Sequence, residues 1–76
     1  MLIRSQNKEH LIECRSFSVT RNFGGGKKSA IIGYIDKGWW SKETTLGLYA
    51  TKEAALEELS RLQTEIANDA KIYEMR

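Results

Sequence analysis

A glycine-rich, basic segment, Gly24-Gly25-Gly26-Lys27-Lys28, is the part of the sequence with the clearest potential for chemistry. Adjacent glycines adopt conformations in which successive backbone N–H groups converge on an anion, and the lysines add positive charge. The second glycine, the Ser or Thr and the following helix of a P-loop are absent, and a hairpin tip uses the same residue types. The segment therefore predicts either a phosphate site or a plain hairpin tip. The residues assigned to the phosphate site are Arg21, Gly24, Gly25, Gly26, Lys27 and Lys28.

Two consecutive tryptophans, Trp39 and Trp40, offer a second kind of contact. Neighbouring residues of a strand point to opposite faces, so one ring can enter the core while the other stays outside. An exposed ring beside Lys37 and Lys42 could stack on a base or anchor a protein partner, whereas the alternative is that both rings pack. The surface assigned to a protein partner consists of Ile31, Ile35, Trp39 and Trp40.

His10 and Cys14, the one histidine and the one cysteine of the sequence, suggest a base and a nucleophile. On a strand they are about 13 Å apart, which is too far for a hydrogen bond, so Cys14 is expected in the core and His10 on the surface. No pair of acidic residues is placed for acid–base catalysis, and the acids of the helix are expected on its solvated face. We therefore expect a non-enzymatic protein with no catalytic residue, bound metal or cofactor.

The length of 76 residues predicts one domain over residues 1–76 that buries only about 60% of the surface of its unfolded chain. The single cysteine cannot form an internal disulfide. Residues 30–35 are apolar on both faces of a strand, so they are expected in a central, doubly covered strand or against a partner. The small core and this strand together predict a homodimer.

Charge is distributed unevenly along the chain. Residues 1–50 contain eight Lys or Arg and four acidic residues, whereas residues 51–76 contain four and six. This asymmetry favours an anionic partner for the first part of the chain, or simply a mixed solvated surface. We expect a cytoplasmic protein without a membrane span. The reasons are a lone thiol, the lack of an apolar run of about 20 residues and the lack of a signal-peptide core.

The elements that position these residues follow from the hydrophobic pattern. The helix is the clearest of them, because Thr51 is a good N-cap and the apolar residues of 52–67 recur at helical spacing. Its docked face is expected to consist of Ala55, Leu59, Leu62 and Ile66. The last strand before the helix is expected to bend or bulge near residues 41–43. Strands are predicted at residues 1–4, 10–14, 16–20, 29–35, 39–49 and 71–75.

Three short pieces of the chain resemble a loose group of small proteins of Gram-positive bacteria and their phages or other mobile elements. The pieces are Ile3-Arg4-Ser5-Gln6, Leu46-Gly47-Leu48-Tyr49-Ala50-Thr51-Lys52-Glu53 with the two alanines that follow, and Tyr73-Glu74-Met75. The resemblance covers the two ends of the chain and not residues 17–42. It implies a bacterial or phage cytosol and supplies no catalytic residues.

These observations predict an α+β fold in which a twisted antiparallel sheet of four to six strands has one amphipathic helix packed on one face. They leave two functions open. The first is a binding protein that engages and modulates or blocks a cellular protein, such as a protein of the host of a phage. The second is a module that binds the phosphate of a nucleotide or nucleic acid at residues 24–28, with a tryptophan stacked on the base.

Overall fold

The computed structural model describes residues 1–22, 26–37 and 40–76. One helix and several short strands make up this part of the chain, which confirms the α+β class. The elements are β1 (Leu2–Arg4), β2 (Leu11–Glu13), β3 (Ser16–Arg21), β4 (Ser29–Lys37), β5 (Trp40–Tyr49), α1 (Lys52–Ala67) and β6 (Ile72–Glu74).

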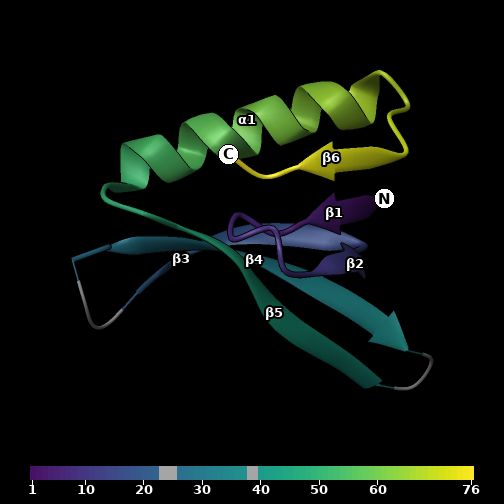
Figure 1. The fold of residues 1–76 in the computed structure, drawn as a ribbon, viewed down its shortest axis with the longest axis horizontal. Coiled ribbons are helices and arrows are strands. Elements are labelled where there is room, and N and C mark those ends of the chain that lie inside the picture. The colour runs from purple at the N-terminus through teal and green to yellow at the C-terminus, as the bar shows by residue number, and fades with distance from the viewer. Residues whose placement is uncertain (23–25, 38–39) are drawn as a thin grey trace.

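The strands form two sheets of three strands, in the orders β2-β1-β6 and β3-β4-β5. A single antiparallel sheet of four to six strands is therefore not confirmed, and β6 pairs with β1 in parallel. In Figure 1, α1 lies along the top, with β6 and β1 beneath it and the β3-β4-β5 sheet below them. The chain changes sheets after Cys14, where the N–H of Arg15 donates to the carbonyl of Tyr34 at 2.9 Å.

The side chain and backbone of Gln6 join the two sheets at β5. The backbone N–H of Gln6 donates to the carbonyl of Leu46, and its side-chain Oε1 accepts from the N–H of Leu48, each at 2.8 Å. The edge of β5 is thus hydrogen-bonded to the segment that follows β1. Pairing of this kind satisfies backbone groups that would otherwise be open to another chain.

One hydrophobic core lies between the helix and the two sheets. As predicted, β4 is the central strand of its sheet, and the neighbouring residues Ala30 and Ile31 are both buried although they point to opposite faces. Cys14 is buried and His10 is exposed, as expected. The buried core cluster consists of Ile3, Cys14, Ile31, Leu46, Tyr49, Ala55, Leu62 and Met75.

Both ends of α1 are closed by local hydrogen bonds. Thr51 is the N-cap, as predicted, and its Oγ1 accepts from the N–H of Ala54 at 3.1 Å. At the other end Asp69 has a φ of 58°, and its N–H donates to the carbonyl of Ile66. The N–H of Ala70 donates to the carbonyl of Glu65, which completes a Schellman motif and ends the helix.

The docked face of α1 is only partly the predicted one. Ala55 and Leu62 are buried and Leu59 is half-buried, but Ile66 is 47% exposed. The residue that takes a place in this face instead is Glu58, which is fully buried. The helix is therefore rotated toward Glu58, and the expectation that all acids of the helix are solvated is wrong.

The irregularity of β5 lies closer to the helix than predicted. The register with β4 shifts between Ile31 and Ile32, which pair with Gly47 and Thr45, so Leu46 is the extra residue. A bulge at this point directs Leu46 into the core. A Cβ at Gly47 would lie 2.8 Å from the hydroxyl of Tyr49, so glycine leaves the space that this ring occupies.

Gly33→Ala is expected to destabilise the fold by about 1 to 3 kcal/mol, because the added methyl overpacks the core. A Cβ at Gly33 would lie 2.7 Å from Sγ of Cys14 and 2.8 Å from Cδ1 of Leu46. Gly26→Ala is the matched control, since a Cβ there meets no atom within 4 Å. Urea denaturation measures both. Adding Cys14→Ala to Gly33→Ala should recover part of the loss, and two independent, additive effects would contradict this close approach.

Candidate anion-binding site at the start of the helix

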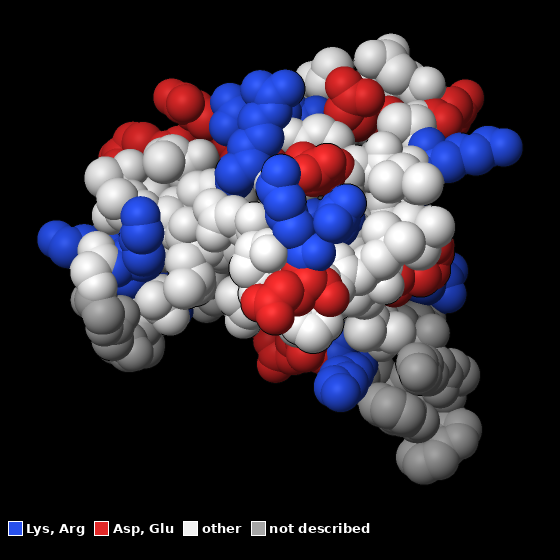
Figure 2. All heavy atoms as spheres, in the orientation of Figure 1, with Lys and Arg blue, Asp and Glu red and all other residues white. Residues whose placement is uncertain are grey.

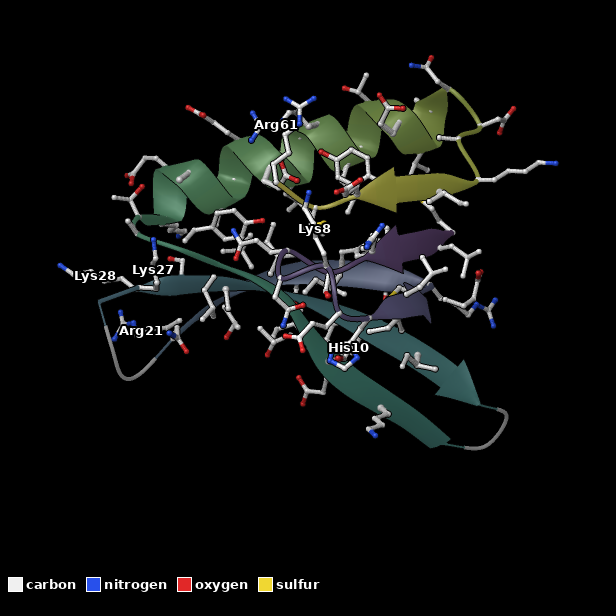
Figure 3. All side chains as sticks on the ribbon, viewed as in Figure 1. Lys8, His10, Arg21, Lys27, Lys28 and Arg61 are labelled. Atoms are coloured by element: carbon white, nitrogen blue, oxygen red, sulfur yellow. The ribbon has the colours of Figure 1, made fainter. Side chains whose placement is uncertain are left out.

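A cavity of about 510 Å³ lies where the end of β3, the start of β4 and the start of α1 meet. Figure 3 shows Arg21, Lys27 and Lys28 gathered at this end of the molecule, and Figure 2 shows blue basic side chains there. Two of these basic residues, Arg21 and Lys28, line the cavity together with Lys52 of the helix. The remaining lining residues are Val19, Thr20, Ser29, Ala50, Thr51 and Glu53.

Backbone hydrogen bonds hold Lys28 in place beside this cavity. Its carbonyl accepts from the N–H of Asn22 at 2.9 Å, and its N–H donates to the carbonyl of Tyr49 at 3.0 Å. The side-chain amide of Asn22 also donates to the carbonyl of Lys27 at 3.0 Å. The backbone of Lys28 is therefore held by Asn22 and Tyr49, so only its side chain has to be ordered when a ligand binds.

The start of α1 adds positive potential to the cavity. The first N–H groups of a helix have no acceptor within the helix, and here Thr51 caps the N–H of Ala54. The N–H groups of Lys52 and Glu53 belong to residues that line the cavity, and the helix dipole favours an anion near them. The lining holds three cationic side chains and the carboxylate of Glu53, so its net charge is positive.

The structure brings together only part of the predicted phosphate site. Arg21 and Lys28 line the cavity, while the exposed residues Gly26 and Lys27 lie beside it, and Gly24 and Gly25 lie outside the described residues. Sequence reasoning missed Lys52. The signal for it was present, because Lys52 directly follows the N-cap Thr51 and so had to lie at the positive end of the helix.

The structure describes the side chains of only two residues of the predicted protein-binding surface, Ile31 and Ile35. Ile31 is 0% exposed, because it lies on the inner side of the central strand against the core, so its assignment to a partner contact is wrong. Ile35 is half-buried. Trp39 lies outside the described residues, and Trp40 begins β5 with a side chain that is also outside the described part.

Glu58 is the most unusual ionisable group in the described chain, because it is a fully buried carboxylate. Its Oε1 accepts from Nε of Arg61 at 2.7 Å, and its Oε2 accepts from the hydroxyl of Tyr73 at 3.0 Å and from the N–H of Arg76 at 2.8 Å. The buried carboxylate is thus satisfied by partners on α1, on β6 and beyond it. We interpret it as the group that attaches β6 and the residues after it to the helix.

Burial and this cluster shift the ionisation of nearby groups. Desolvation and then the hydrogen bond to Glu58 raise the pKa of Tyr73, and burial raises the pKa of Tyr49. Burial also raises the pKa of the Cys14 thiol, which keeps it protonated at neutral pH and makes it a poor nucleophile. The Cys14, Tyr49 and Tyr73 side chains are therefore uncharged at neutral pH in the folded protein.

The described residues contain neither a cluster of potential metal ligands nor a helix that could span a membrane. No three of their His, Cys, Asp and Glu side chains cluster so that they could hold a metal ion. Their one helix is too short and too polar to cross a membrane. Comparison of the chain with protein-family models, with curated proteins and with solved structures finds no match.

Proposed function

We propose that this protein binds a phosphate-bearing ligand, a nucleotide or a nucleic acid, in the cavity at the start of α1. The observation that supports this function best is the meeting of Arg21, Lys28 and Lys52 around one cavity at a helix N-terminus. The competing function is binding to a protein partner. Of the residues expected to contact that partner, Ile31 is buried and so cannot reach it.

The dimensions and the charge of the cavity suit a phosphate chain better than a single small anion. Ligand cavities in proteins have volumes of about 300 to 1,000 Å³. The cavity here falls in that range, with about 510 Å³. Its cations come from β3, from the residue before β4 and from α1, so they can contact successive phosphates, and the hydroxyl of Ser29 in the lining can donate to phosphate oxygens.

Lys28→Ala and Lys52→Ala are each expected to weaken the binding of a nucleoside triphosphate or a single-stranded oligonucleotide by about three- to tenfold. Each substitution should also make the salt dependence shallower, by about 0.7 in the slope of log K against log salt for a single strand. Lys27→Ala should have a smaller effect because Lys27 does not line the cavity. Isothermal titration at several salt concentrations measures these differences.

Lys71→Ala is the matched control, because it removes the same charge from an exposed position next to β6. All four variants should keep the melting temperature of the original protein, since exposed lysines contribute little to stability. The proposal fails if the original protein shows no salt-sensitive binding to either probe. It also fails if Lys71→Ala weakens binding as much as Lys28→Ala does.

A further inference from the structure

The small sheet β2-β1-β6 has one face in the core and one face in solvent. Ile3 of β1 and Tyr73 of β6 point inward. The neighbouring residues of each strand point outward, and among the outward residues Leu11 and Ile72 are each 58% exposed. These are the two most exposed large apolar side chains of the described residues. They both line a cavity of about 360 Å³ on this face.

The register of β1 and β6 arranges the outward residues in two rows. Leu2 is the partner of Ile72, and Arg4 is the partner of Glu74. Partners in register point to the same face of a sheet, and the pairing of β1 with β2 adds Glu13 to the first row and Leu11 to the second. Within β1 and β6, the apolar row is Leu2 with Ile72, and the charged row is Arg4 with Glu74. Glu74 is exposed and already pairs with Lys8, at 3.0 Å between Oε1 and Nζ.

The geometry points to a second copy of this chain as the occupant of this outer face. A two-fold axis that lies in the interface, parallel to the strands and midway between β1 and β6, exchanges these two strands between copies. It places Leu2 of one copy against Ile72 of the second copy, and Arg4 of one copy against Glu74 of the second. Every such contact occurs twice, which is the self-complementarity that a two-fold interface requires.

The charges of this face favour a second copy over a partner of one sign. A purely acidic surface would repel Glu74, and a purely basic one would repel Arg4, whereas a copy related by this axis offers each charge its opposite. Three-residue strands present a small area, so the dimer is expected to be weak and to dissociate in the micromolar range. This association is independent of the phosphate site, which lies at the start of α1.

Charge reversal separates contacts between copies from contacts within one copy. Arg4→Glu leaves two acids in the charged row, and Glu74→Arg leaves two bases, so like charges of the two copies would face each other. Each variant alone should therefore sediment as a monomer at about 100 μM, where the original protein is expected to sediment as a dimer. An equimolar mixture of the two variants should recover the dimer mass, because every acid then faces a base of the other variant. Contacts within one chain cannot produce this recovery.

Ile72→Asp should also abolish the dimer, because it places a charge in the apolar row. Leu48→Asp is the control, since Leu48 is an exposed apolar residue of the other sheet and its substitution should leave the dimer mass unchanged. Circular dichroism verifies that each variant is folded. The inference is overturned if the original protein is a monomer at about 100 μM. It is also overturned if the mixture of the two charge variants stays monomeric, or if the Ile72→Asp variant still forms a dimer.

Discussion

Replacing Glu58 by Ala is expected to lower the free energy of unfolding by about 3 to 5 kcal/mol. The carboxylate is fully buried, and its removal deprives the Tyr73 hydroxyl and the Arg76 N–H of their acceptor. It also leaves a cavity between α1 and β6. A domain of this length has a total stability of about 4 to 11 kcal/mol, so the loss is a large fraction of it. Urea denaturation followed by circular dichroism measures the change.

Two further substitutions give this expectation its controls. Glu57→Ala removes a carboxylate from an exposed position of the same helix, so it should change stability by less than about 0.5 kcal/mol. Glu58→Gln keeps the shape and one acceptor oxygen, so it should cost less than Glu58→Ala. Equal stability of the Glu57→Ala and Glu58→Ala variants would show that the buried carboxylate does not hold β6 to the helix.

The same cluster predicts a loss of stability at alkaline pH. Burial raises the pKa values of Tyr49 and Tyr73 in the folded state. The unfolded chain therefore releases these protons first, above about pH 10, and stability falls as the pH rises beyond that value. Below it the contribution is fully present. Tyr73→Phe removes one of the two groups, so its stability should fall less steeply between pH 9 and 11, roughly, than that of the original protein.

Leu62→Ala is the second substitution with a large expected effect, about 2 to 5 kcal/mol. Leu62 is buried in the core cluster, so truncation removes apolar contact and leaves a cavity. Ile66→Ala is the matched control from the same helical stripe. Since Ile66 is 47% exposed, its truncation should cost less than about 1 kcal/mol, and Leu59→Ala should fall between the two.

Thermal and urea unfolding of these three helix variants test the orientation of α1. The order of destabilisation expected is Leu62, then Leu59, then Ile66. If Ile66→Ala were the most destabilising of the three, the helix would be docked through the face that the hydrophobic spacing alone suggests, and the buried position of Glu58 would be wrong.

The proposed phosphate site shows how much of a site local sequence patterns can predict. Arg21 and Lys28 could be selected from the sequence because glycines and basic residues lie close together in the chain. Lys52 could not be joined to them, because it is 24 positions beyond Lys28 and lines the same cavity only because β5, which leads into α1, pairs with β4. Local composition thus identified part of the proposed site. The pairing of β4 with β5 brings the remaining cation, Lys52, to the same cavity.

The sequence by itself determined the elements whose causes are local. Thr51 supplies the N-cap and the apolar spacing after it supplies the helix, so the strand-to-helix join and the bounds of α1 could be predicted. Apolar residues on both faces of 30–35 likewise favoured a central strand or a partner contact, and β4 is the central strand of its sheet. The tendency of a lone cysteine to be buried placed Cys14 in the core.

Only the tertiary structure decided which side of each element is used. Helical spacing defines an apolar stripe, but the rotation of α1 is set by β6, because Tyr73 and the backbone after it bring donors to Glu58. The parallel pairing of β1 with β6 joins segments from the two ends of the chain, and no local pattern specifies such a pairing. Hydrophobic periodicity can be read from residues that are close in the sequence. Whether a residue is buried depends instead on the elements that pack against it, which can be distant in the sequence.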